Sequence, residues 1–178
     1  EANLITFTPE NWKDVLGRDR PHLLLVESAW QGNDSSWRSQ IVNLGQRPSN
    51  QLPELVQWCK TQNIPTAFWN KEDPAHYDEF LDAALLFDYV FTIDADCIER
   101  YKKDLGHGNV FCLPFAIQPK IHNPVGSGQK IRNIAFAGSW YASEAEDKKL
   151  RREQMANILA PALPYDVDIY DRNYSMNN

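Results

Sequence analysis

The chain has 178 residues and a formal net charge of -6, and 43% of its residues are hydrophobic and 12% aromatic. This length fits one domain, or one domain with part of another, and the hydrophobic share suffices for a core. The lack of a basic tract argues against a protein that coats nucleic acid. No apolar run approaches the roughly 20 residues that span a bilayer, and no secretory signal is recognisable.

The three cysteines are Cys59, Cys97 and Cys112. Their odd number and the lack of a CxxC spacing argue against a disulfide framework and against a zinc site. Each lies in a segment with the pattern of a helix or a buried strand. The sequence therefore predicts reduced structural thiols, no bound metal and a cytoplasmic location.

Predicted strands and helices alternate along the chain. The strands have near-continuous apolar runs, which are typical of parallel strands covered on both faces. The first helix carries Leu52, Leu55 and Val56 on one stripe. In chain order, the predicted elements are a strand at 22–30, a helix at 52–63, a strand at 64–70, a helix at 76–87, a strand at 89–94, a helix at 94–106, and strands at 109–115 and 133–140, then a helix at 143–160 and a strand at 166–171.

This alternation predicts an α/β fold: an open, doubly wound, Rossmann-like parallel sheet with helices on both faces. Ligands of such sheets bind outside the carboxyl ends of the strands. Residues 119–132 have no periodicity and read as a linker between a domain at 1–118 and a segment at 133–178. One strand–helix–strand unit is too small for a sheet of its own. It either extends the first sheet or begins the second domain of a longer protein, which is the interpretation we favour.

Polar residues follow the first predicted strand. Glu27 lies near its end, and Trp30, Gly32 and Asn33 follow in a turn. A glycine in such a turn lets a ligand approach backbone amides. The GxGxxG spacing of a dinucleotide site is absent. The alternative is a solvated loop that Asn33 or Asp34 caps.

A denser polar group follows the second predicted strand, in the stretch IPTAFWNKEDPAHYDEF; its members are Trp69, Asn70, Lys71, Glu72, Asp73 and His76. A carboxylate there acts as a general base if its pKa is raised. Lys71 or His76 can bind phosphate or stabilise the negative charge of a leaving group. In the alternative, Glu72 and Asp73 only stabilise the N-terminus of the next helix.

Two further groups follow the last two predicted strands. Gly138, Ser139 and Trp140 form a small turn before a helix, where a diphosphate can meet backbone amides. Asp171 could accept a hydrogen bond from a ribose hydroxyl, and Arg172 could hold a phosphate. The alternatives are a plain turn and a surface salt bridge. No GxSxG, P-loop or metal-ligand spacing is present.

Six segments, in order, resemble the CgeB-like (spore maturation protein CgeB) glycosyltransferases: LLLVESAWQGN, IPTAFWNKEDPAHYDEF, FDYVFTIDADCIERYKKDLG, LPFAIQPKIHNP, IAFAGSWY and DIYDRNY. WNKEDP and FAGSWY are the most specific of them, and the resemblance spans residues 21–174. It implies a GT-B fold, in which two Rossmann-like domains face each other across a cleft. Residues 1–118 would be the N-terminal, acceptor-side domain, and 133–178 the incomplete start of the nucleotide-sugar-binding domain.

The resemblance implies transfer of a sugar from a nucleotide-sugar donor to a glycan, a protein or another cell-surface acceptor, without a metal or other cofactor. The family's late donor-binding Glu motif has no counterpart here, so the isolated chain is expected to be inactive if it is truncated. Glu72, Asp73 or Glu27 would be the base of an inverting reaction, and would only orient hydroxyls in a retaining one. The implied donor-binding residues are Gly138, Ser139, Trp140, Asp171 and Arg172, and the implied cleft residues are Trp30, Asn33, Trp69, Asn70, Lys71 and His76.

A non-catalytic α/β domain that binds a sugar or nucleotide, or serves as a scaffold, is the alternative function. A phosphoacceptor receiver domain is disfavoured. Asp94 and Asp96 follow a strand, but the acidic pair of a receiver follows its first strand.

Overall fold

The computed structural model describes residues 3–46, 51–123, 134–140, 146–172 and 174–176. These residues belong to two compact units, Glu1–Gln118 and Pro119–Asn178. The parts of the chain are not placed relative to one another, so the units are considered separately.

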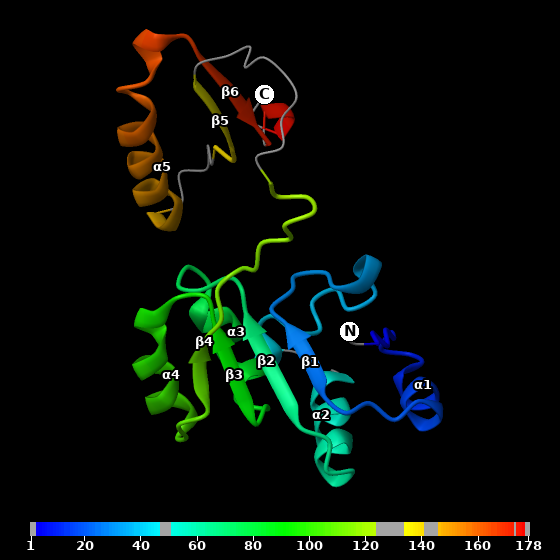
Figure 1. The fold of residues 1–178 in the computed structure, drawn as a ribbon. Helices are drawn as coiled ribbons and strands as arrows, with labels where there is room; N and C mark the ends of the chain where they lie inside the picture. Colours follow the sequence, from blue (N-terminus) through cyan, green and yellow to red (C-terminus); the bar gives the residue numbers. More distant parts are fainter. Residues whose placement is uncertain (1–2, 47–50, 124–133, 141–145, 173, 177–178) are drawn as a thin grey trace. The chain divides into compact units, whose positions relative to one another are not determined.

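The first unit contains a parallel sheet of four strands, as the sequence predicts. The strands lie in the order β1-β2-β3-β4, and all three neighbouring pairs are parallel (Figure 1). Each strand lies inside a predicted apolar run and is shorter than that run. The strands are β1 (Leu24–Glu27), β2 (Thr66–Asn70), β3 (Tyr89–Thr92) and β4 (Val110–Cys112).

The helices of the first unit are α1 (Trp12–Arg18), α2 (Gln51–Thr61), α3 (Tyr77–Ala84) and α4 (Ile98–Leu105). Asp94 caps the short 3-10 turn before α4, since its side chain accepts a hydrogen bond from the Asp96 N–H. Gly106 ends α4 in the left-handed conformation, with φ of 73°. Helix α1 was not expected from the sequence pattern.

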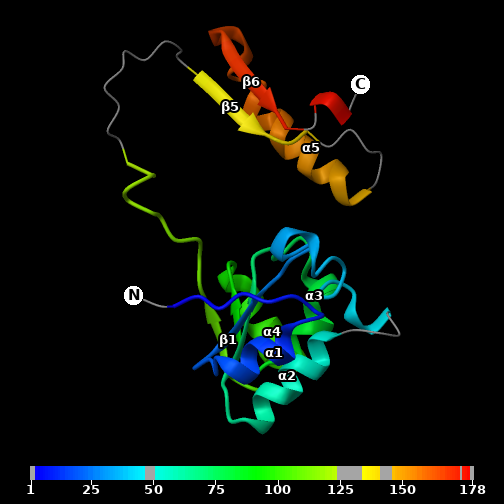
Figure 2. The same ribbon diagram turned by 90° about the vertical axis from the view of Figure 1, so that its right-hand side faces the viewer.

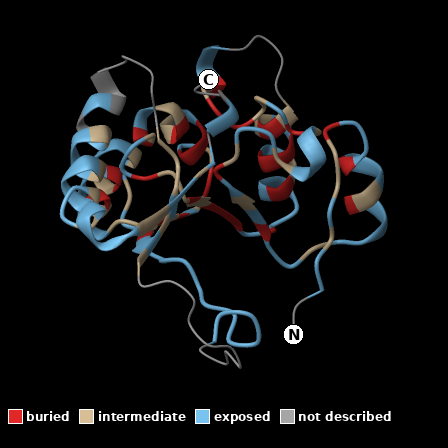
Figure 3. Ribbon diagram, turned by 90° about the horizontal axis from the view of Figure 1, so that it is seen from above, coloured by how far each residue is buried: buried red, intermediate tan, exposed pale blue. Residues whose placement is uncertain are grey.

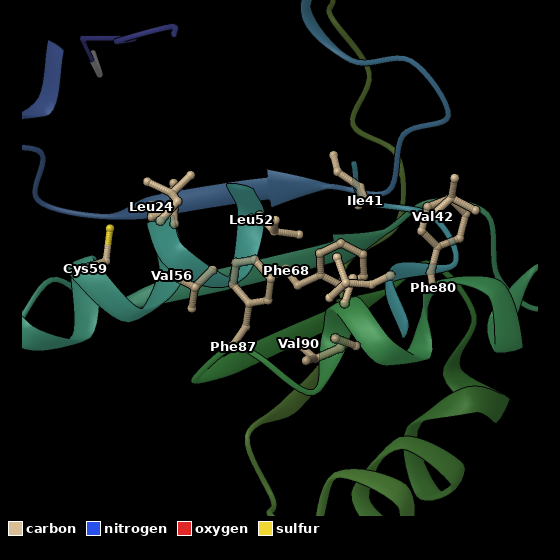
Figure 4. Packing of buried hydrophobic residues seen from close by; sticks show 14 of the residues in the cluster. Leu24, Ile41, Val42, Leu52, Val56, Cys59, Phe68, Phe80, Phe87 and Val90 are labelled. Atoms are coloured by element: carbon tan, nitrogen blue, oxygen red, sulfur yellow. The ribbon is translucent and has the colours of Figure 1, made fainter. Parts of the chain in front are cut away.

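The helices lie on one face of this sheet, whereas we predicted helices on both faces. The strand order never reverses, and a right-handed crossover between successive neighbours always passes over the same face. Figure 2 shows the helices on one side of β1. A single apolar cluster joins the sheet to α2 and α3. In its middle the Phe68 ring lies 5.4 Å from the Phe87 ring and 6.5 Å from the Phe80 ring (Figure 4).

The other side of the sheet is exposed and apolar, and we call it the open face. Its residues alternate with those of the core, so it is made by Leu25, Ala67, Trp69, Tyr89, Phe91 and Phe111, with Leu113 and Phe115 just beyond β4. Several of these side chains are about half exposed. Buried residues, red in Figure 3, are concentrated instead where the helices meet the strands.

The second unit has one parallel pair of strands. Strand β5 (Ile134–Gly138) pairs with β6 (Val167–Asp171) in a sheet of its own, so among the described residues this unit does not extend the first sheet. Helix α5 (Glu146–Leu159) connects the two strands and lies beside them (Figures 1 and 2).

Candidate functional site

The carboxyl ends of β1 and β2 meet, as the predicted location of a ligand site requires. Glu27 and Trp69 are partners in the sheet register. Just beyond them, the Ser28 N–H donates to the Trp69 carbonyl at 2.9 Å. The Lys71 N–H donates to the Ser28 hydroxyl at 2.8 Å. These bonds hold the chain after β2 against the end of β1.

Glu27 and Lys71, which are 44 residues apart in sequence, form an ion pair at this edge. The Lys71 Nζ lies 2.5 Å from the Glu27 Oε2, and the two side chains are 26% and 46% exposed, respectively. The same Nζ lies 5.5 Å from the Trp69 ring centroid. The Trp69 indole N–H donates to the Leu113 carbonyl at 2.9 Å, which fixes the ring. A carboxylate, an ammonium and an aromatic ring are thus reachable from solvent in one place.

Asn70 and Asp73 lie beneath this surface, in a buried network. The Asn70 amide donates to the Asp73 Oδ1 and to the Tyr101 hydroxyl, both at 2.8 Å. The Thr92 hydroxyl donates to the Asp73 Oδ2 at 2.6 Å, and Tyr101 donates to its Oδ1 at 3.2 Å. All four residues are buried. The network ties β2 to β3 and α4.

Burial raises the pKa of the Asp73 carboxyl to about 6, and the hydrogen bonds from Thr92 and Tyr101 offset part of that rise. Asp73 is 6% exposed and Asn70 is fully buried. Asn70 therefore does not line the surface of this unit, contrary to our expectation. A role of Asp73 as a base stays a prediction, although both of its oxygens already accept hydrogen bonds within the fold.

Trp30 and His76 form a second contact between the segments that follow β1 and β2. Their ring centroids lie 5.1 Å apart, and the Trp30 ring also lies 5.5 Å from that of Phe80. The Nδ1 of His76 is 3.1 Å from the Glu79 Oε1. Trp30 stays 42% exposed, so its ring can still contact a ligand.

The other predicted residues of the first unit lie apart from these contacts or face solvent. The Asn33 side-chain amide donates to the Phe7 carbonyl at 3.1 Å, so it fixes the N-terminal segment. Glu72 is partly exposed, and its backbone N–H donates to the Asn70 Oδ1 at 3.0 Å. Of the three predicted bases, Glu27 is the one that pairs with a cation at the edge of the sheet.

In the second unit, Gly138, Trp140 and Asp171 come together at the carboxyl ends of β5 and β6. The Asp171 Oδ1 accepts a hydrogen bond from the Trp140 N–H at 2.8 Å, and the Arg172 N–H donates to the Gly138 carbonyl at 2.8 Å. A Cβ on Gly138 would lie 2.7 Å from the Phe136 ring, so glycine has a packing reason to be there. Ser139 is partly exposed and Arg172 is exposed.

Tyr101 and Thr92 are the residues that the sequence analysis missed. The position of Thr92 was predictable, because it lies two residues after Val90 and so points to the same, helix-covered face of β3. Tyr101 had none beyond its place in a helix, since its partner Asn70 is 31 residues away.

In the described part of the chain, no three His, Cys, Asp or Glu side chains are grouped as metal ligands. Its helices include none with the length and apolar character to cross a membrane. Two shallow hollows lie at the opposite, amino ends of the strands, and Asn63 and Ile64 line both. They are remote from the edge where ligands of such sheets bind.

Among curated proteins, the chain is similar to the spore protein CgeB of Bacillus subtilis (strain 168), with 30% identity over 94 residues. The match covers 52% of this chain and 29% of CgeB, so it spans less than a third of that protein's length. No protein-family model matches the chain. No solved structure matches it either. The similarity supports a CgeB-like relationship, and the name of that protein states no activity.

Proposed function

We propose that this chain is part of a glycosyltransferase that moves a sugar from a nucleotide-sugar to a glycan, a protein or another cell-surface acceptor. The first unit contributes acceptor contacts and the second contacts the donor. Two features support this proposal: parallel strands with polar residues at their carboxyl ends in both units, and the similarity to CgeB.

The observation that carries the proposal is the exposed group of Glu27, Lys71 and Trp69. Sugars offer hydroxyls to a carboxylate and an apolar ring face to an aromatic side chain. This group provides both around Lys71, whose Nζ lies 2.5 Å from the Glu27 Oε2 and 5.5 Å from the Trp69 ring centroid. In an inverting reaction, Glu27 takes the proton of the acceptor hydroxyl. In a retaining reaction, it orients that hydroxyl.

In the second unit, Arg172 is the candidate partner of the donor diphosphate. An exposed guanidinium beside the turn at Gly138 can form paired hydrogen bonds with phosphate oxygens. Asp171 holds the Trp140 amide in place and remains the candidate for the ribose hydroxyl.

The first test is a thermal-shift screen with UDP, GDP, dTDP and CMP, with and without a chelator. We expect one nucleotide to raise the melting temperature whether or not the chelator is present. Arg172→Ala should abolish that shift, whereas Arg151→Ala, an exposed arginine of the same unit, should keep it. If none of the nucleotides shifts the wild type, a donor-binding role is refuted.

Glu27→Gln in the full-length enzyme is the second test, with Glu54→Gln as its control. Glu54 is similarly exposed, at 51%, and pairs with Lys13 at 2.6 Å, but on the helical side of the unit. Removal of a general base lowers turnover by roughly 10²–10⁴-fold. We expect that loss from the first variant alone. Unchanged turnover in Glu27→Gln would show that Glu27 is not the base.

A non-catalytic sugar-binding or scaffolding domain is the second candidate. The burial of Asn70 and Asp73 favours it, because a predicted cleft residue and a predicted base are hydrogen-bonded to each other inside the fold. Such a domain would bind a nucleotide or sugar without turnover, and Glu27→Gln would then change affinity alone.

A further inference from the structure

The open face of the first unit is too apolar to be an ordinary solvent-exposed surface. Leu25, Tyr89, Phe111, Leu113 and Phe115 are between 41% and 62% exposed. Parallel sheets are almost always covered on both faces, and their strands carry apolar side chains on both sides. Among the described residues of this unit, the helices cover only the opposite face.

The area of this patch is close to the apolar part of a protein interface. An aromatic side chain offers about 150–250 Å², so five large side chains that are half exposed leave on the order of 500 Å² of apolar surface. A standard interface buries about 800 Å² per partner, and about 65% of it is apolar in homodimers. The open face can therefore supply the apolar centre of one standard homodimer interface.

Charge on this face is compatible with contact between two identical copies. Its carboxyl edge carries Glu27 and Lys71, which already pair within the chain. The centre is uncharged: Ala67 lies between Leu25 and Tyr89 in one register row, and Trp69, Phe91 and Phe111 are neighbours in the next. Two such faces can meet about a twofold axis without placing unpaired like charges opposite each other.

We propose that the open face binds the open face of a second copy of this chain. The two sheets stack face to face, as in sandwiches where sheets lie about 10 Å apart. The helical layers then lie on the outside. The contact between the Trp69 and Phe115 rings, whose centroids are 5.9 Å apart, fixes two of the largest side chains before the copies meet. Because Trp69 lies in this interface, the dimer contact and an acceptor at Glu27, Lys71 and Trp69 exclude each other.

The test is sedimentation equilibrium of the 178-residue chain over about 1–100 µM, where dimers with micromolar Kd dissociate measurably. We expect a monomer–dimer equilibrium. Leu25→Glu and Phe111→Glu lie on the two edge strands of the open face and should each raise the dimer Kd at least roughly tenfold. Leu85→Glu is the matched control, because Leu85 is 50% exposed on the helical side, against 52% for Leu25.

Circular dichroism of each variant checks that it folds, and if one of the two open-face variants does not, the other carries the test. A chain that stays monomeric throughout the range refutes the proposal. A dimer that Leu85→Glu disrupts, while Leu25→Glu and Phe111→Glu leave it intact, also refutes it.

Discussion

The side chain of Asp73 illustrates how one residue can combine a structural and an electrostatic role. It ends the polar stretch after β2, yet it is 6% exposed and accepts hydrogen bonds from three side chains. Asn70, Thr92 and Tyr101 come from three different elements. Removing the carboxyl therefore affects the joint between β2, β3 and α4 as well as any chemistry at the surface.

The raised pKa of Asp73 predicts a pH dependence of stability. In the unfolded chain this carboxyl ionises at its ordinary pKa of 3.8, whereas in the folded chain it keeps its proton up to about pH 6. Between these values the folded state binds more protons, so the contribution of Asp73 to stability falls as the pH rises. The difference corresponds to about 3 kcal/mol.

Urea unfolding of the wild type and of Asp73→Asn at pH 4 and pH 7 measures this contribution. The stability of the wild type relative to the variant should be lower at pH 7 than at pH 4 by about 2 kcal/mol, because asparagine does not titrate and the unfolded carboxyl is already partly ionised at pH 4. An equal difference at the two pH values would show that the folded carboxyl ionises normally.

At the scale of elements, Gly17 and Gly106 lie near the C-terminal ends of two helices and differ in backbone conformation. A Cβ on either Gly17 or Gly106 would meet no atom within 4 Å, so the two sites differ only in their backbone. Gly17 lies inside α1 with a helical conformation, and Gly106 has φ of 73°.

We expect Gly17→Ala to stabilise the first unit by about 0.5–1 kcal/mol, since alanine favours a helix. Gly106→Ala should destabilise it by about 1 kcal/mol, because a Cβ is strained in the left-handed region. Both changes are measurable by denaturant unfolding. The same sign of effect in both variants would contradict this account of the helix ends.

The sequence predicted the positions of the strands and helices along the chain better than their arrangement in space. Every described strand lies within a predicted apolar run, because burial on a parallel sheet leaves a local pattern. Helix α1 escaped prediction because it has only seven residues and a glycine near its end. The prediction of helices on both faces of the sheet was wrong. The face that a helix covers depends on the strand order, and strand order is set by pairing between distant segments that a local sequence pattern does not reveal.

The candidate site shows the same division. Glu27 and Lys71 could be predicted at one edge because Glu27 ends one strand of a parallel sheet and Lys71 directly follows the next. The burial of Asn70 could not, because it depends on Tyr101 in a helix far along the chain. The aromatic residues of the open face are indistinguishable from core residues in the sequence.

At the scale of the whole first unit, the core lies on one face of the sheet. Truncation of a large side chain should therefore reduce the free energy of unfolding much more on the core face than on the open face. Phe68 is fully buried between the rings of Phe80 and Phe87, whereas Phe115 is 62% exposed. Phe68→Ala should cost about 3–5 kcal/mol, because it leaves a cavity.

Phe115→Ala should cost less than about 1 kcal/mol, as for surface substitutions. Thermal unfolding at concentrations low enough to keep the chain monomeric measures both values. Similar costs for the two variants would mean that the open face is covered within a single copy.

The strand order also determines how deep a ligand can lie in the first unit. In sheets whose strand order reverses, the loops on either side of the reversal leave to opposite faces, and the gap between them is the crevice that encloses a ligand. The order β1-β2-β3-β4 has no such reversal, so its loops all turn the same way. A sugar at Glu27, Lys71 and Trp69 therefore rests on a rim and keeps much of its hydration. The first unit alone should hold an acceptor weakly and exchange it fast.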